Sequence, residues 1–536
     1  MLHDLALLTP LLITLAAALF TLLVDPFLRH EGTTFGARFW GYFGAAFSLI
    51  TLAATAVLWV TGPHEMATVA FSGHLSMSPY GLFFVALVSV CAALTHLTSP
   101  RFLEEQGMSF AEFYALLHFA AFGMMVMVAA ESILTLFIGL EIMSLSIYVL
   151  AAFKRSSAAS IEAGTKYFLM GAVSSALLLY GMAFVYGFSG GTSYVEIQRA
   201  LIDLHGPEHL YLSLSLVFLL AAFLFKVSAV PFHMWAPDAY EGAPTSITGF
   251  MSSGVKVAAF GALLKLLVVP MSGEALASLP VGIGSLLAIF AVITMTVGNL
   301  LALPQRNVKR MLAYSAIAHA GYLLLGCVAM SPDPGLGAPY ALPGGNIPFY
   351  LVGYDLASLA AFAALVTVGA DGEELTTESQ LAGLGRRHPF AGAVLGLAMI
   401  SLAGVPPTLG FFGKFVMLRE VLSVEDGRYL PHVVIMVLNS VVAAYYYLRV
   451  TVYIYMRPEG ATERRYVREP SLSWAMGLAA AGLLIIGLLP GKAIEASRKA
   501  AAGVRTGIAV AHLHNTIDAR QATAKDPAEV VVGQAD

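Results

Sequence analysis

The chain has 536 residues, of which 58% are hydrophobic and only 12% are charged, and its net charge is −4. Because a typical soluble domain carries about 25% charged residues, this composition indicates a polytopic membrane protein. No basic stripe that would neutralise phosphates is present, so we expect contacts with membrane lipids and none with nucleic acid.

The sequence carries no recognisable redox, metal or nucleotide site. Its two cysteines, Cys91 and Cys327, lie far apart in apolar runs, whereas an iron–sulfur cluster needs about four ligands. No P-loop and no strand-associated GxGxxG is present. We therefore expect no cofactor on this chain and interpret both cysteines as small buried hydrophobic residues.

A membrane-crossing helix needs about 20 apolar residues. The first run, Leu5 to Val24, lacks a basic N-terminal region and is too long for a signal-peptide core, which favours a retained span. The polar, alanine-rich tail after about Arg505 is predicted to lie outside the spans. In chain order, the predicted spans are 5–24, 40–61, 79–98, 111–130, 132–152, 164–188, 210–230, 245–268, 278–302, 309–330, 347–369, 389–409, 430–455 and 471–490.

Basic residues orient these spans. With the N-terminus outside, most arginines and lysines of the loops fall inside, among them Lys154, Arg155, Arg386 and Arg387. An even number of spans then places both termini outside. The basic stretch 492–505 goes against this bias, and we expect it to lie along the membrane surface.

Two predicted spans combine a lysine with prolines that interrupt a helix. Lys226 precedes Pro231 in the seventh span, and Lys414 follows Pro406 and Pro407 in the twelfth. A charged residue in a span is a functional candidate by default, and polar groups beside broken helices form the ion sites of transporters. The reversed order of lysine and proline suggests two inverted repeats.

Other polar residues lie within apolar runs. Glu141 has no basic residue within helical reach, so it is either a proton carrier that tunes a lysine or a carboxyl bonded to a neighbouring helix. Lys256 lies too deep to reach the membrane surface easily, whereas Lys265 fits a lysine that extends to the surface. Lys166 lies near a helix start, as either a channel residue or an interfacial anchor.

Two histidines and one further lysine complete the candidate set. His233 follows the proline break and either exchanges protons or donates a structural hydrogen bond. His319 lies in mid-span, as either a functional or a core residue, and Lys309 begins the same span as a basic residue at the inside surface. Together the candidates form a possible proton relay: Glu141, Lys166, Lys226, His233, Lys256, Lys309, His319 and Lys414.

Three long motifs carry a family resemblance: FKVSAVPFHMWAPDAYEGAP from Phe225, NVKRMLAYSAIAHAGY from Asn307 and SLAGVPPTLGFFGKF from Ser401. They resemble the antiporter-like membrane subunits of respiratory complex I, a family that includes Mrp-type cation/proton antiporters and membrane-bound hydrogenase subunits. The resemblance extends over roughly residues 80–455. The segments FHMWAPDAYEGAPTSITGF and LEIMSLSIYVL are most similar to the subunit N branch of this family.

The resemblance implies an all-α fold of fourteen transmembrane helices with two inverted five-helix repeats, each with a broken helix. The expected division is 1–110 (three helices), 111–268 (first repeat), 278–455 (second repeat), 456–505 (last helix and flank) and 506–536 (tail). By motif match, Glu141, Lys226, Lys256 and Lys414 are the family's buried acid and lysines, and Lys166, His233 and Lys309 match further polar positions.

The implied function is proton translocation in the membrane arm of an NADH–quinone oxidoreductase of a bacterial inner membrane. Partner subunits would carry FMN, the iron–sulfur clusters and the quinone. Two alternatives remain at this stage. One is an Mrp-type Na⁺/H⁺ antiporter subunit, and the other is a scaffold whose buried charges only fix helix packing.

Overall fold

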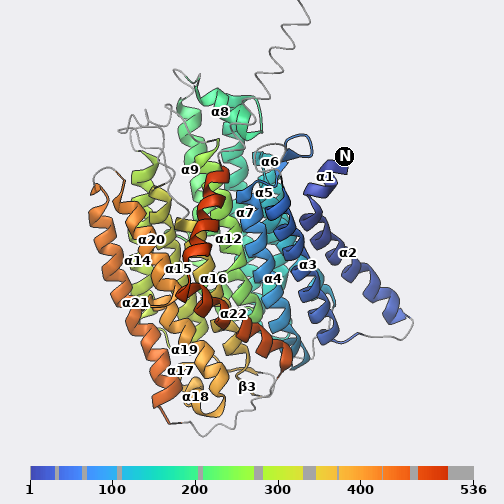
Figure 1. The fold of residues 1–536 in the computed structure, drawn as a ribbon, viewed down its shortest axis with the longest axis vertical. Coiled ribbons are helices and arrows are strands. Elements are labelled where there is room, and N and C mark those ends of the chain that lie inside the picture. The colour runs from blue at the N-terminus through green and yellow to red at the C-terminus, as the bar shows by residue number, and fades with distance from the viewer. Residues whose placement is uncertain are drawn as a thin grey trace, which may run out of the picture.

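The computed structural model describes residues 2–30, 35–62, 69–105, 111–202, 204, 209–270, 282–329, 346–370, 373–424, 427–458 and 469–504. These residues form a bundle of helices that run along the long axis of the molecule (Figure 1). The predicted tail 506–536 and Arg505 lie outside the described residues.

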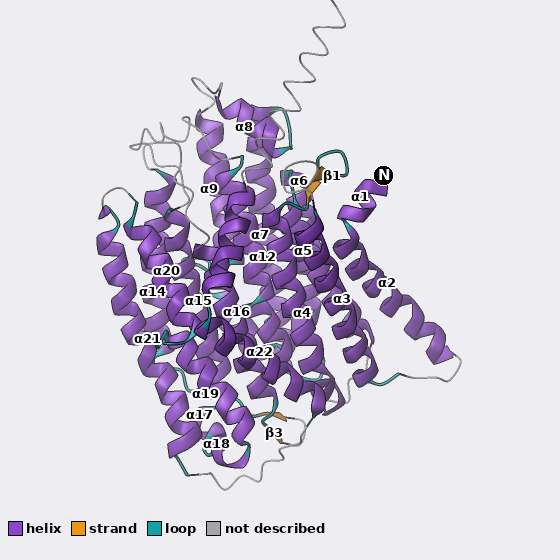
Figure 2. Ribbon diagram, viewed as in Figure 1, coloured by secondary structure: helices purple, strands orange, loops and turns teal. Residues whose placement is uncertain are grey.

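Thirteen spans among the described residues are long and apolar enough to cross a membrane. The single-helix spans are α2 (Thr9–His30), α3 (Ala37–Thr61), α4 (Pro79–Glu105), α5 (Ala111–Ala129), α6 (Ile133–Ala151), α7 (Ala158–Ser189), α9 (His209–Lys226), α14 (Ile283–Ala302), α15 (Val308–Val328), α16 (Asn346–Val366), α21 (Leu430–Met456) and α22 (Pro470–Leu488). Almost everything else that is regular in the described chain is also helical (Figure 2).

The remaining long span is divided at Ser253, whose backbone (φ −104°, ψ −84°) is not helical. It consists of α11 (Thr245–Ser252) and α12 (Gly254–Val268). This break was not expected from the sequence, because no proline lies nearby. Every residue of α11 and α12 is buried, so neighbouring helices surround the break.

The predicted twelfth span is two short helices, α19 (Pro389–Ala403) and α20 (Leu409–Leu422). Gly404 ends α19 with φ +85°, a conformation that favours glycine. Pro406 and Pro407 then follow, and neither can donate a backbone hydrogen bond. This broken segment and the thirteen long spans account for the fourteen predicted segments.

The predicted seventh span is interrupted as expected. Helix α9 ends at Lys226, and α10 (Trp235–Gly242) begins after a non-helical stretch that contains Pro231. The two helices therefore place Lys226 at a helix end and not in the middle of a continuous helix.

Short elements cap the bundle. Helices α1 (Leu2–Leu7) and α8 (Tyr194–Ile202) lie at one end, together with the hairpin of β1 (Val69–Ala70) and β2 (Leu75–Ser76). Helices α17 (Glu378–Leu381) and α18 (Leu384–Arg387) lie at the opposite end, with the hairpin of β3 (Gly369–Ala370) and β4 (Glu373–Glu374).

The interior of the bundle is built from α4, α5, α12, α15 and α16, most of whose residues are buried. The outer helices expose large apolar side chains, for example Leu169 and Val173 of α7 and Val441 of α21. Apolar outer faces suit a hydrocarbon solvent. Residues 491–504 continue as a helix after α22, and Gly503 lies against Pro79 at the start of α4.

Candidate functional site

The first buried unit joins α6 to α9. The ammonium of Lys226 donates to Ser144 Oγ at 2.9 Å and to Tyr148 OH at 3.3 Å. Glu141, one turn before Ser144, is half-buried and accepts a hydrogen bond from Ser175 of α7. Lys226 and Glu141 are close enough for their charges to interact, so the structure brings this acid and this base together.

The second unit centres on Lys256, the third residue after the break at Ser253. Its ammonium donates to the backbone carbonyl of Ala316 in α15 and lies 5.7 Å from the ring centroid of Tyr354 in α16. The lysine thus connects three interior helices. Its acceptor, Ala316, lies one turn before His319 on α15.

His319 has hydrogen-bond partners at both ring nitrogens. Nδ1 lies 2.6 Å from Tyr350 OH, and Nε2 lies 3.1 Å from Tyr447 OH. Both Lys256 and Lys414 act on it electrostatically. The histidine is therefore within electrostatic reach of both lysines and is bonded to hydroxyl groups that both donate and accept protons.

The third lysine lies at the break between α19 and α20. The ammonium of Lys414 donates to the carbonyls of Leu402 and Ala403, both at 3.1 Å. These carbonyls end α19, where orphan acceptors and the negative end of the helix dipole favour a cation. A Cβ on Gly404 would lie 3.2 Å from Nζ, so the glycine also makes room for the lysine.

A cavity of about 10 Å³ lies between His319 and this break. Its walls include His319, Tyr350, Tyr354 and Ser401. A space of this size holds about one water molecule. One water could therefore extend the hydrogen-bonded path beyond the histidine.

The three central lysines share one property. Lys226, Lys256 and Lys414 are 2%, 1% and 7% exposed, and each ammonium donates to a neutral oxygen. Among the carboxylates that the structure describes, none forms an ion pair with them. Their charge is therefore not fixed by a permanent counter-ion, in contrast to the lysines described next.

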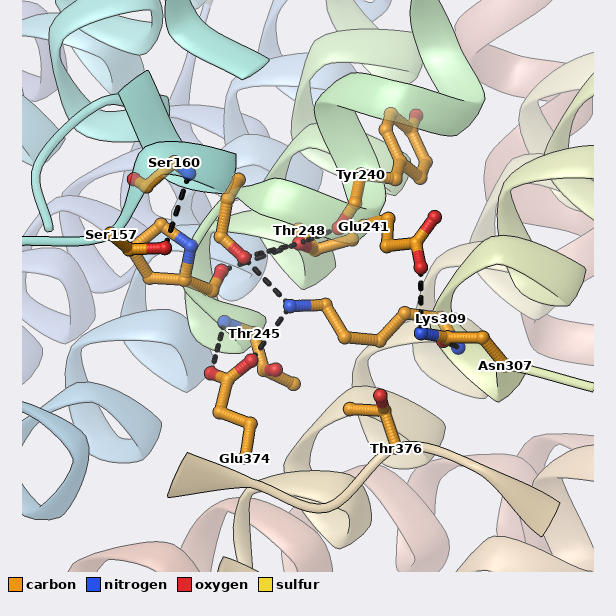
Figure 3. A network of polar contacts seen from close by, with 12 residues as sticks. Ser157, Ser160, Tyr240, Glu241, Thr245, Thr248, Asn307, Lys309, Glu374 and Thr376 are labelled. Atoms are coloured by element: carbon orange, nitrogen blue, oxygen red, sulfur yellow. Dashed lines mark hydrogen bonds and ion pairs between the residues drawn. The ribbon is translucent and has the colours of Figure 1, made fainter. Parts of the chain in front are cut away.

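Lys309 lies in a different setting (Figure 3). Its buried ammonium donates at 2.7 Å to the Ala243 carbonyl and at 2.7 Å to Glu374, which also accepts from the Thr245 backbone. Burial of Glu374 opposes its ionisation, but the charge and hydrogen bonds of Lys309 and Thr245 outweigh this and lower the pKa of the carboxyl. Lys309 is thus a buried cation with a carboxylate partner, and not only a basic residue at the inside surface.

Lys166 belongs to an ion-pair cluster near the same end of the bundle. It is 42% exposed and pairs with Glu162 and Asp238, while Arg310 pairs with Asp238 and Glu241. Burial of Asp238 opposes its ionisation, but hydrogen bonds from Lys166 and Arg310 outweigh it and lower the pKa of that carboxyl. The structure does not bring Lys166 together with the buried lysines, and Asp238 and Glu241 do more than cap a helix.

His233 lies between α9 and α10, seven residues beyond Lys226. It is half-buried, and its neighbours Pro231 and Met234 are exposed on the surface of the chain. The histidine is therefore close in sequence to the buried lysine, and its Nδ1 atom is buried although two of its chain neighbours are exposed.

The sequence matches a model of the family described as "NADH:quinone oxidoreductase/Mrp antiporter, TM" over residues 130–442. The chain is also 40% identical over 460 residues to NADH-quinone oxidoreductase subunit N of Trichlorobacter lovleyi, which covers 86% of this chain and 89% of that protein. The chain belongs to the NADH:quinone oxidoreductase/Mrp antiporter family.

Two solved structures share the family fold. A chain of respiratory complex I from Thermus thermophilus with bound aureothin matches 90% of this chain and 98% of its own length, with a TM-score of 0.72 and 31% identity. A chain of the Mrp complex from Dietzia matches 95% of this chain and 99% of its own, with a TM-score of 0.78 and 19% identity. The second likeness concerns the fold alone.

Two polar residues of this family member were misjudged or missed from the sequence. Lys265 was expected to extend to the membrane surface, but its ammonium is buried in the protein and pairs at 2.8 Å with Glu131, in the connector between α5 and α6. Asp355 is a buried carboxylate in α16. The signal that identified Glu141, a carboxylate within an apolar run, is also present around Asp355 and could have found it.

Proposed function

We propose that the chain is the subunit N of an NADH–quinone oxidoreductase and translocates protons in its membrane arm. The observation that carries this proposal is the series of buried acid, base and histidine groups from Glu141 through Lys226 and Lys256 to His319 and Lys414. The names of relatives such as the Trichlorobacter lovleyi protein support the assignment. In this proposal, partner subunits of the membrane arm surround the chain, and other partners carry FMN, iron–sulfur clusters and quinone.

The central lysines suit proton transfer because neutral oxygens hold them. A lysine paired with a carboxylate stays charged, whereas the charge of Lys226, Lys256 or Lys414 responds to a proton or charge that arrives nearby. Movement of Glu141 toward Lys226 favours the ammonium, and movement away favours release of a proton. The released proton passes toward Lys256, then to His319 and Lys414.

We assign Lys166, His233 and Lys309 to the side from which protons enter. Lys166 and Lys309 lie with the ion pairs at one end of the bundle, and basic residues of α18 lie at that end too. By the distribution of basic residues this end faces the inside of a bacterial inner membrane, with both termini outside. We also propose that 111–268 and 278–455 are inverted units, each with a lysine beside a broken helix.

A second candidate is an Mrp-type Na⁺/H⁺ antiporter subunit, because the description of the matching family includes Mrp antiporters and the Dietzia chain shares the fold. At 19% identity this likeness supports the fold only, whereas the subunit N relative is 40% identical. The two functions differ in what drives proton movement. In the first it is electron transfer from NADH to quinone, and in the second it is a sodium gradient.

The test uses inverted membrane vesicles from cells that lack the chain and from cells in which it has been restored. We expect NADH-driven quinone reduction coupled to proton uptake only in the restored vesicles, and no effect of sodium. Proton movement that depends on sodium and persists without NADH would contradict the proposal and support the antiporter. Unchanged NADH-driven uptake without the chain would contradict it as well.

A further inference from the structure

Asp355 is a buried carboxylate that the proposed relay does not use. It lies in the middle of α16 and is 1% exposed, and both of its carboxylate oxygens lack a hydrogen-bond partner within the described part of the chain. Helix α16 packs against α4, α11, α12, α15, α19, α20 and α22. The side chain is therefore enclosed within the bundle, where an unpaired ionised carboxylate is costly.

The groups that act on Asp355 come from three helices. Lys256 of α12 is the cation whose charge interacts with it, and Cys91 of α4 and Tyr354 of α16 are the other titratable groups. The Lys256 ammonium lies 5.7 Å from the ring centroid of Tyr354, the residue next to Asp355. The buried acid is thus next in sequence to a residue that contacts this lysine, and the two charges interact.

A buried acid and a buried base close together need not both stay charged. If the ammonium of Lys256 gives its proton to the carboxylate of Asp355, the products are a neutral amine and a carboxylic acid. The net charge of the pair is zero before and after this transfer, and no other reactant is needed. A second proton that arrives makes the pair positive, which favours transfer onward to His319.

We propose that Asp355 is an acid–base partner of Lys256 and that the two residues hold and exchange one proton. Asp355 is the carboxylate near Lys256, as Glu141 is the carboxylate near Lys226. Neither carboxylate forms an ion pair with its lysine in the described part of the chain. This inference rests on the proposed function, because it adds a proton-carrying residue to that relay. It does not depend on the identity of the quinone or of any partner.

The test substitutes Asp355 in the assembled complex and measures NADH-driven quinone reduction and proton uptake in inverted vesicles. We expect Asp355→Asn to lower coupled turnover about fivefold or more, and Asp355→Glu, which keeps the acid, to stay within about twofold of the wild type. Asp25→Asn is the matched control, because Asp25 is equally buried but accepts from Trp40 in the N-terminal helices. The control is expected to keep wild-type turnover and its pH profile, whereas Asp355→Asn changes that profile.

A double variant covers the case in which Asp355→Asn assembles poorly. Adding Lys256→Gln removes the charge that Asp355→Asn leaves without a partner. We expect assembly to recover, and turnover to be no lower than with Lys256→Gln alone, because the two residues act as one unit. The inference would be overturned if the double variant lost turnover by the product of the two single-variant losses. It would also be overturned if Asp355→Glu lowered turnover as much as Asp355→Asn.

The outcomes separate this inference from the proposed function. Normal coupled turnover in Asp355→Asn, with a loss in Lys226→Ala, would overturn the role of Asp355 alone. Normal coupled turnover in both variants would overturn the proposed function.

Discussion

Lys226 is held by Ser144, one turn beyond Glu141, and forms no direct ion pair with that carboxylate in the described part of the chain. The ammonium donates to Ser144 Oγ at 2.9 Å, and Ser144 lies three residues beyond Glu141 on the same face of α6. Ser175 of α7 holds the carboxylate from the other side. A change of side-chain rotamer can therefore alter the separation of acid and base without breaking a salt bridge.

Ser144→Ala tests the hydrogen bond that holds Lys226. Because a hydrogen bond to a charged group is worth about 1.5–3 kcal/mol, we expect coupled proton uptake to fall about threefold to tenfold, with normal assembly. Ser146→Ala is the control, since Ser146 donates to the Ile142 carbonyl of the same helix as Ser144 donates to the Leu140 carbonyl, whereas the Lys226 ammonium donates to Ser144. Equal rates in the two variants would mean that the bond from Lys226 to Ser144 plays no part in proton uptake.

Lys414→Arg tests whether the last lysine must lose its proton. Arginine stays protonated in proteins, so we expect NADH-driven proton uptake to fall about tenfold or more. Lys265→Arg is the control, because Lys265 is buried and already paired with Glu131. If Lys414→Arg pumped like the wild type, Lys414 would be a fixed charge and not a proton carrier.

Glu374→Gln tests the ion pair that encloses Lys309. The Glu374 side chain is 25% exposed, and its pKa in the folded chain lies below the ordinary value of 4.5. Its contribution to stability is therefore complete above pH 4.5 and is lost as the pH falls through the lower folded-state pKa. We expect the variant to be less stable by about 1–3 kcal/mol near neutral pH.

The measurement is the temperature of dissociation of the solubilised complex across a pH series. The difference between wild type and Glu374→Gln should be largest near neutral pH and should shrink in acid. A difference that grew as the pH fell would contradict the assignment of Glu374 as the ionised partner of Lys309.

The sequence predicted the elements of the fold and the central residues because each has a local signal. Apolar runs of about 20 residues marked the spans, and a charge within such a run marked Glu141, Lys226, Lys256 and Lys414. Prolines marked the breaks after Lys226 and before Lys414. These signals need no knowledge of the neighbouring helices.

Pairings between distant segments could not be predicted in this way. Lys309 and Glu374 are 65 residues apart, and Lys265 and Glu131 also come from different helices, so surface positions seemed reasonable for both lysines. The break at Ser253 has no proline beside it, and the Ser253–Gly254 pair, which permits a kink, is a weaker local signal. Lys166 matched a polar motif position, yet its partners Asp238 and Glu162 hold it apart from the buried lysines.

The most direct measurement is NADH-driven quinone reduction and proton uptake in inverted vesicles that carry Lys226→Ala, with the amount of assembled complex determined alongside. Lys492→Ala, a substitution of an exposed lysine, is the control. We predict that both activities fall about tenfold or more in Lys226→Ala while assembly holds, because the relay loses its first base. Unchanged reduction and unchanged proton uptake would contradict a role for Lys226 in coupled proton translocation.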